Sequence, residues 1–199
     1  TLWGNAGNDQ IFGESGLDLL VGEGGTDFIY GGDGADIIYG DQYAPVRVGS
    51  ILTPDATDAL FGQDGGDTIY GGGGGDGING GAGIDTLYGE AGVDWIYGGT
   101  EGDFIYGGDD GDALFGQAGD DEMYGEAGDD SLDGGWGHDE LFGGAGIDFI
   151  YGGIGNDILH GGDDTDSMQG EAGNDTLNGG AGDDGMDGGY DNDTLSGDA

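Results

Sequence analysis

The sequence contains no cysteine, two prolines and a single basic residue, Arg47, among its 199 residues. Without cysteine, disulfides and thiolate metal sites are excluded. Because one cation makes no basic patch, we expect no nucleic-acid partner. No apolar run approaches the ~18 residues that a membrane helix needs, so we also expect no membrane span.

Glycine and acidic residues are abundant instead. The chain has 56 glycines and 43 acidic residues, which give a formal charge of −42. Composition alone would fit a disordered polyanion, and collagen is excluded because glycine does not recur at every third position. A charge of this size opposes a compact state by self-repulsion, so the partner that the composition favours is a cation.

A nine-residue repeat organises almost the whole chain. Units begin at Gly4 and follow by nines to Gly40, then resume at Gly62 and continue to Gly188. Residues 4–196 therefore hold twenty units, of which the fifth carries thirteen extra residues. Position 1 is always Gly, position 6 always Asp, and position 8 always Ile, Leu or Met, in the consensus G-G-x-G-x-D-x-U-x, where U is a large aliphatic residue.

The repeat predicts short strands joined by turns. In the triplet at positions 7–9, alternation turns position 8 inward and positions 7 and 9 outward. Positions 1–6 are then expected to turn the chain, with Gly at 1, 2 and 4 permitting positive φ and close backbone approach. Two units would close one coil, and stacked coils would form a rod about 45–50 Å long. The predicted fold is an all-β, right-handed parallel β-roll, a β-solenoid of about ten coils that spans 1–199 as a single domain.

The consensus resembles the RTX family, the hemolysin-type calcium-binding nonapeptide repeats of secreted bacterial proteins. The resemblance covers nearly the whole chain and implies that Ca²⁺ lies between the turns of units n and n+2. Asp at position 6 of both turns and carbonyls of positions 1–4 would be the ligands. Such a mixture of oxygens suits a hard dication, and twenty units allow at most about eighteen ions.

The predicted metal ligands are the position-6 carboxylates and turn carbonyls. The carboxylates are Asp9, Asp18, Asp27, Asp36, Asp58, Asp67, Asp76, Asp85, Asp94, Asp103, Asp112, Asp121, Asp130, Asp139, Asp148, Asp157, Asp166, Asp175, Asp184 and Asp193. The expected carbonyls include those of Gly81, Gly83, Gly144, Gly146, Gly180 and Gly182. A role of Asp as a mere turn residue is disfavoured, because ordinary turns also accept Asn or Ser. Sites are less certain where position 4 is not glycine, at Glu101, Asp110, Asp164 and Asp191, and the interrupted turn before Asp58 should lose or reshape its site.

The insertion in the fifth unit lies at residues 43–57, YAPVRVGSILTPDAT. It holds both prolines, Arg47 and several apolar residues. Because the interrupted unit still counts as one, the turns that follow keep their edges, and the insertion is expected to be a loop or short hairpin. It is either a tolerated loop insertion or a docking element for another chain or for a neighbouring domain.

Aromatic residues recur at the outward position 9. Alternate units give one succession, Tyr39, Tyr70, Tyr88, Tyr106, Tyr124 and Phe142, and the remaining units give a patchier one that includes Tyr97. One interpretation is cross-strand stacking that stabilises each sheet. The other is a surface for lateral association or for a ligand such as carbohydrate.

No constellation of residues points to catalysis, because His138 and His160 are isolated and no hydrolase motif is present. We therefore expect a non-enzymatic, calcium-binding extracellular structural module: a rod, filament or matrix element. The alternative is the calcium-triggered folding and secretion region of a larger type I-secreted toxin, adhesin or hydrolase. In both cases metal-binding energy becomes folding energy, so the chain would fold at millimolar Ca²⁺ outside a bacterial cell. Copies could associate end to end through bare strand edges or through the aromatic face.

Overall fold

The computed structural model describes residues 1–40 and 57–197, and these residues form strands and turns only. The strands make two parallel sheets, which we call the odd sheet and the even sheet. The odd sheet consists of β1 (Leu2–Ala6), β3 (Leu19–Gly24), β5 (Ile37–Tyr39), β7 (Thr68–Gly73), β9 (Thr86–Ala91), β11 (Phe104–Asp109), β13 (Glu122–Ala127), β15 (Glu140–Ala145), β17 (Ile158–Asp163), β19 (Thr176–Ala181) and β21 (Thr194–Ser196). The even sheet consists of β2 (Gln10–Ser15), β4 (Phe28–Asp33), β6 (Ala59–Asp64), β8 (Gly77–Ala82), β10 (Trp95–Thr100), β12 (Ala113–Ala118), β14 (Ser131–Trp136), β16 (Phe149–Ile154), β18 (Ser167–Ala172) and β20 (Gly185–Asp187).

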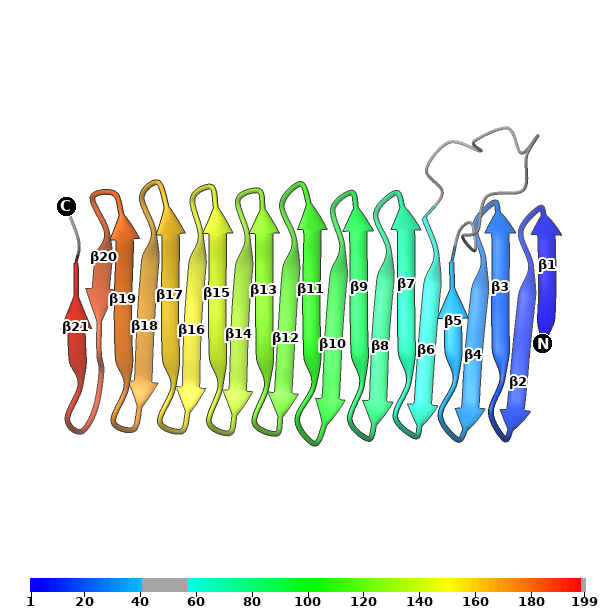
Figure 1. The fold of residues 1–199 in the computed structure, drawn as a ribbon, viewed down its shortest axis with the longest axis horizontal. Helices are drawn as coiled ribbons and strands as arrows, with labels where there is room; N and C mark the ends of the chain where they lie inside the picture. Colours follow the sequence, from blue (N-terminus) through cyan, green and yellow to red (C-terminus); the bar gives the residue numbers. More distant parts are fainter. Residues whose placement is uncertain (41–56, 198–199) are drawn as a thin grey trace.

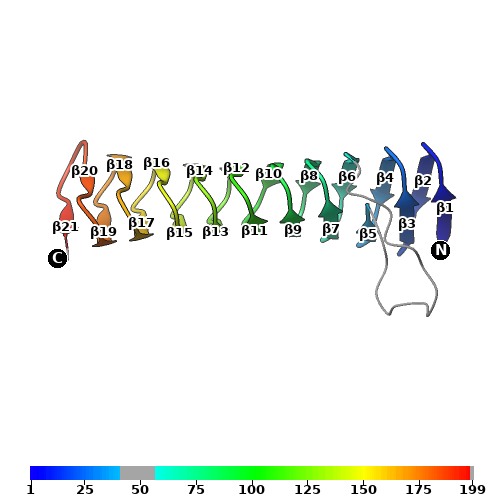
Figure 2. The same ribbon diagram turned by 90° about the horizontal axis from the view of Figure 1, so that it is seen from above.

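The chain winds between the two sheets, and each strand pairs with the strand two places later (Figure 1). Leu87 in β9 lies opposite Ile105 in β11, two repeats further on. Seen from above, the strands of the two sheets form two layers along the length of the molecule (Figure 2). The predicted all-β parallel solenoid of about ten coils is confirmed.

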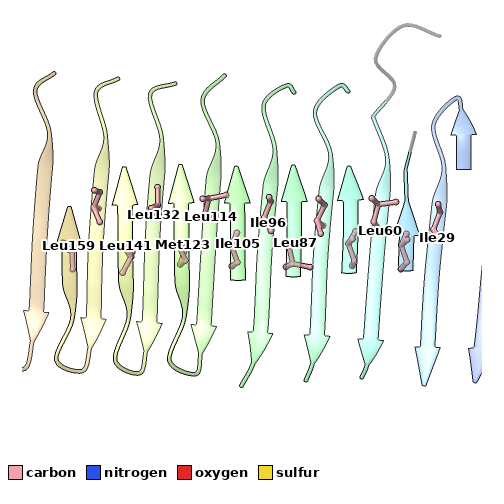
Figure 3. Packing of buried hydrophobic residues seen from close by; sticks show 14 of the residues in the cluster. Ile29, Leu60, Leu87, Ile96, Ile105, Leu114, Met123, Leu132, Leu141 and Leu159 are labelled. Carbon is pink, nitrogen blue, oxygen red and sulfur yellow. The ribbon is translucent and has the colours of Figure 1, made fainter. Parts of the chain in front are cut away.

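The core is a double row of the position-8 side chains between the sheets (Figure 3). From Leu20 to Leu177 each of them is at most 1% exposed, as the repeat predicted. Met186 is only partly buried, and Leu195 on the last strand is 47% exposed. One aliphatic side chain in each unit thus forms the interior on which all other positions are arranged.

The strands are longer than the sequence predicted. A typical strand such as β9, Thr86–Ala91, has six residues, covering positions 7–9 and the next unit's positions 1–3. The prediction that positions 1–6 all belong to the turn is wrong. Because every coil repeats the same backbone path, the residues at positions 2 and 3 pair in register with the coil above, as Glu90 does with Gly108, so only positions 4–6 turn the chain.

Glycine has two different roles in each unit. Positions 2 and 4 have left-handed φ values, as at Gly81 (112°) and Gly83 (126°). Position 2 nevertheless accepts other residues at positive φ, for example Glu90 at 75°. Gly89, at position 1, is required for a different reason: a methyl group there would lie 2.3 Å from Oδ2 of Asp94 and 2.5 Å from the carbonyl oxygen of Gly107.

The insertion does not disturb the stacking around it. Ile29 in β4 pairs with Leu60 in β6, and Ile38 in β5 pairs with Ile69 in β7, so the alternation of edges is kept as predicted. The insertion itself, apart from Thr57, lies outside the described residues. No helix in the described part of the chain is long and apolar enough to cross a membrane.

Candidate metal centres

The position-6 aspartates form two Asp ladders, one along each edge of the solenoid. In each ladder the backbone N–H of one aspartate donates to Oδ1 of the aspartate in the next coil, as from Asp85 to Asp103 at 2.8 Å. Eighteen such hydrogen bonds, 2.6–3.0 Å long, connect the described coils. One ladder contains Asp9, Asp27, Asp58, Asp76, Asp94, Asp112, Asp130, Asp148, Asp166 and Asp184; the other contains Asp18, Asp36, Asp67, Asp85, Asp103, Asp121, Asp139, Asp157, Asp175 and Asp193.

In sixteen of these aspartates the second carboxylate oxygen is buried and lacks a hydrogen bond. Oδ2 is buried and without a hydrogen-bond partner in Asp9, Asp27, Asp36, Asp67, Asp85, Asp94, Asp103, Asp112, Asp121, Asp130, Asp139, Asp148, Asp157, Asp166, Asp175 and Asp184. Asp85, Asp94 and Asp148 are completely buried. Since native proteins rarely leave a buried polar atom without a partner, each such oxygen points to a missing positive group.

Carbonyl oxygens approach the same turns from the neighbouring coil. A methyl group at Gly81 would lie 2.2 Å from the carbonyl oxygen of Gln63, and one at Gly83 would lie 1.6 Å from that of Gly65. The carbonyls at positions 2 and 4 of one coil therefore point at the same positions of the next coil. Backbone oxygens of the neighbouring coil thus lie close to the turns that hold the buried carboxylates.

Of the predicted carbonyl ligands, Gly83, Gly146 and Gly182 lie in the turns, and Gly81, Gly144 and Gly180 lie near the ends of the strands before them. Gly81 and Gly83 precede Asp85, and both have φ values in the left-handed region. The pairs Gly144 with Gly146 and Gly180 with Gly182 have the same arrangement before Asp148 and Asp184, with φ between 88° and 157°. The predicted carbonyls therefore lie in, or shortly before, the turns that hold the predicted carboxylates.

Burial makes ionisation of these carboxylates unfavourable. Desolvation is the main cause, and neighbouring carboxylates of the same ladder add to it. Together they raise the pKa of Asp103 to about 8, and those of Asp85 and Asp112 to about 7, from an ordinary value of 3.8. The ladder hydrogen bond opposes the shift without abolishing it. Ionised ladders would therefore need a cation within the turns.

Comparison with known protein families decides the identity of the repeat. A family model described as RTX calcium-binding nonapeptide repeat (4 copies) matches residues 1–20, 15–42, 55–87, 73–105, 88–121, 106–141, 133–168 and 160–195. The chain belongs to the RTX calcium-binding nonapeptide repeat family. No curated protein matches the chain.

The donor set of the RTX turns fits calcium. Ca²⁺ takes six to eight oxygens and readily mixes carboxylates with backbone carbonyls. Within the described ranges no three acidic or histidine side chains are close enough together to hold a metal by themselves. Coordination in these turns would therefore combine a few carboxylate oxygens with several carbonyls, as the buried Oδ2 atoms and the neighbouring carbonyls allow.

The irregular turns keep the backbone shape of the regular ones. Glu101, Asp110, Asp164 and Asp191 stand at position 4 with φ between 70° and 79°, so the left-handed conformation is retained without glycine. Asp58 also keeps its place, because its Oδ1 accepts the N–H of Asp27 at 2.7 Å and the residue is 3% exposed. Weaker calcium binding at these turns remains a prediction.

A second polar ladder on one edge escaped the sequence analysis. The N–H of His138 donates to Asp120, that of Asn156 donates to Nδ1 of His138, and that of Asn174 donates to Asn156, each at 2.8 Å. These residues occupy position 5 in alternate units. Comparison of position 5 at intervals of eighteen residues rather than nine would have found them, since nine-residue steps mix the two edges.

The outward aromatic rings stack on one another, as the cross-strand interpretation predicted. On the odd sheet an unbroken series lies with ring centroids 4.6–5.0 Å apart and interplanar angles of at most 10°: Tyr39, Tyr70, Tyr88, Tyr106, Tyr124, Phe142 and His160. On the even sheet, Phe12, Tyr30 and Phe61 stack, and so do Tyr97 and Phe115. Stacked rings cover each other's faces, which leaves mainly their edges for a ligand.

Proposed function

We propose that the chain is an extracellular structural module, a rod, filament or matrix element of a bacterium, that folds when it binds calcium. Residues 1–199 would act as one calcium-binding unit. The observation that carries the proposal is the double row of buried Oδ2 atoms without hydrogen-bond partners. Binding of calcium supplies positive charge to these turns and offsets the repulsion within the ladders.

The two carboxylate oxygens of each ladder aspartate would have different roles. Oδ1 connects one coil to the next through the N–H of the preceding aspartate, as from Asp103 to Asp85. Oδ2, together with carbonyls of positions 1–4, would face the ion, so each aspartate holds two coils together. Nine junctions on each edge set the number of ions at up to about eighteen.

We propose no catalytic role for this chain. Nδ1 of His138 accepts the backbone N–H of Asn156, and the ring of His160 stacks on Phe142 with centroids 4.6 Å apart. Both histidines therefore have structural partners. The rigid repeat supports a mechanical role, in which stability and length are the useful properties.

Calcium would also permit copies of the chain to associate. A formal charge of −42 keeps metal-free chains apart. About eighteen dications would bring the charge close to neutral. Contact end to end or through the aromatic face would then produce filaments.

The second candidate is a calcium-triggered folding and secretion region of a larger type I-secreted protein. The same need for cations along both ladders favours this candidate. Because the cytosol contains little calcium, the chain would stay unfolded there. A protease, lipase or pore-forming region encoded in the same gene would support this candidate over the first.

Circular dichroism in calcium and in excess EGTA tests the folding mechanism. At pH 8 we expect a β spectrum in millimolar calcium and its loss in EGTA; a full β spectrum that persists in EGTA at this pH would refute calcium-driven folding. Electron microscopy of the calcium-loaded protein separates the two candidates. Ordered filaments support the structural module, whereas strictly monomeric particles count against it.

A further inference from the structure

A trough on the outer face of the even sheet is not explained by calcium binding. It has a volume of about 530 Å³ and crosses β10 to β18, and its lining includes Thr100, Gln117, Asp133, Trp136, Ile154 and Glu171. Ala118, Gly99, Gly135 and Gly153 complete the lining, and the three glycines contribute no side chains to it. The volume falls in the range of about 300–1,000 Å³ usual for small-molecule sites.

Trp136 is the dominant side chain of this trough. Its surface is 66% exposed, and Ile154, its register partner in β16, is 58% exposed. In β12 the register partner is the small Ala118. Unlike the stacked rings of position 9, the indole of Trp136 makes no ring contact with the other described residues. A large flat apolar surface is thus open to a ligand.

The surroundings of the trough are unusual for so acidic a chain. The six strands β8, β10, β12, β14, β16 and β18 contain two charged residues, Asp133 and Glu171, and both line the trough. The described strands supply no cation there, because the only Lys or Arg of the chain is Arg47. Acceptors therefore outnumber donors: two carboxylates, the amide oxygen of Gln117 and the hydroxyl oxygen of Thr100, whose O–H already donates to Glu101, stand against the amide N–H groups of Gln117.

This chemistry selects one class of ligand. An anion is disfavoured because it would meet carboxylates and no positive group. Asp133 and Glu171 stand two strands apart, about 9–10 Å across the sheet, and are also two residues out of register, so they are too distant to share one cation. A second copy that docked by this same face would bring its own Asp133 and Glu171 against these carboxylates, with no cation from the described strands between them. The ligand that remains is neutral, has hydroxyl donors at its rim and offers an apolar face.

We propose that the trough binds a neutral polysaccharide chain. The apolar C–H face of a sugar ring would stack on the indole of Trp136, and its hydroxyl groups would donate to Asp133, Gln117 and Glu171. Because the trough crosses successive strands of a stacked sheet, it suits an extended chain rather than a single sugar. The site goes beyond the proposed structural role and would attach the rod to a glycan.

Affinity electrophoresis in calcium-containing native gels tests the site, with laminarin and hydroxyethylcellulose as neutral probes and polygalacturonate as the anionic probe. We expect retardation by at least one neutral probe. Trp136→Ala should weaken it about tenfold or more, because it removes the central aromatic contact. The matched control is Trp95→Ala, since Trp95 lies on the same sheet, is 55% exposed and is not in the trough. This control should bind like the unmodified chain.

A spectroscopic arm uses the variant with Trp3→Phe and Trp95→Phe, in which Trp136 is the only tryptophan. Its fluorescence should shift to the blue when the retarding glycan is added. Four results would overturn the proposal: no retardation by a neutral probe, retardation by polygalacturonate alone, equal losses in both alanine variants, or dimerisation that Trp136→Ala abolishes. Circular dichroism of the same calcium-loaded samples shows whether the chain is folded. A β spectrum without glycan binding would refute the glycan site and leave the folding proposal intact.

Discussion

The two sheets have the same interior and different exteriors. Inward positions are alike throughout: an aliphatic residue at position 8, Gly at position 1 and Asp at position 6. Outside, the odd sheet has an unbroken stack of rings from Tyr39 to His160. On the even sheet the rings are interrupted by Asn79 and Asp133, and an unstacked Trp136 lies beside the second interruption. Packing and metal binding restrict the residue types of the interior, so the residues in which the two sheets differ lie on their outer faces.

The largest expected effect is the pH dependence of folding, because it involves the buried aspartates on both edges of the solenoid. In the metal-free fold the pKa of Asp103 is about 8 and that of Asp85 about 7, above the ordinary 3.8. Folding therefore binds protons, and metal-free stability should fall as pH rises from about 4 to about 8. Calcium requires the ionised form, so its effect has the opposite sign.

Circular dichroism measures both sides of this dependence. In buffer freed of calcium by ion exchange, the β signal should be larger at pH 5 than at pH 8. In calcium titrations, the midpoint should move to higher calcium when the pH is lowered from 8 to 5. Midpoints that do not depend on pH would show that ionisation of the ladders is not linked to folding.

Asparagine in place of a single ladder aspartate should have opposite effects with and without calcium. Asp103→Asn and Asp112→Asn, one on each edge, keep an oxygen for the ladder and remove the buried charge. Without calcium both variants should be more stable than the unmodified chain. With calcium both should be less stable, by about 1.5–3 kcal/mol, the usual value of a hydrogen bond to a charged group.

The β signal that remains in calcium-free buffer and the thermal unfolding in calcium measure the two sides of this reversal. Asp109→Asn is the control, since Asp109 is exposed at the end of β11. Loss of stability in both conditions would mean that the carboxylates act through hydrogen bonding alone.

Alanine at position 1 should cost the same on the two edges. A methyl group at Gly98 or Gly107 would lie 2.5 or 2.4 Å from Oδ2 of the nearby aspartate, and 2.9 or 2.8 Å from a carbonyl oxygen. Overpacking of this kind costs about 1–3 kcal/mol, and it should also raise the calcium midpoint. Ser131→Ala on an outward position is the control. A large difference between Gly98→Ala and Gly107→Ala would contradict the equivalence of the interiors.

The smallest expected effect distinguishes the two outer faces. Tyr106 stacks on Tyr88 and Tyr124, at 4.8 and 5.0 Å. Tyr151, at the equivalent position of the even sheet, is flanked in register by Asp133 and Gln169. Because each stacked pair contributes about 0.5–1.5 kcal/mol, Tyr106→Ala should lose about 1–3 kcal/mol more than Tyr151→Ala. Equal losses in calcium-loaded thermal melts would show that stacking does not stabilise the odd sheet.

The sequence predicts the place of a residue well where the same residue type recurs at every ninth position. Ile105 in the core and Asp103 in its ladder follow from the invariant positions, and the structure places both as predicted. The six-residue strands could not be inferred, because pairing at Glu90 requires a left-handed residue to remain in register with the next coil. Trp136 was overlooked because its neighbours are residues eighteen positions away.

A measurement of bound calcium together with the folded fraction tests the central claim most directly. Equilibrium dialysis over a range of free calcium, with circular dichroism on the same samples, gives ions per chain and the folded fraction together. The account predicts that both rise in one cooperative step and that the folded chain holds close to eighteen ions, about nine on each edge. A chain that is fully folded before calcium binds, or that folds with only a few ions, would contradict it.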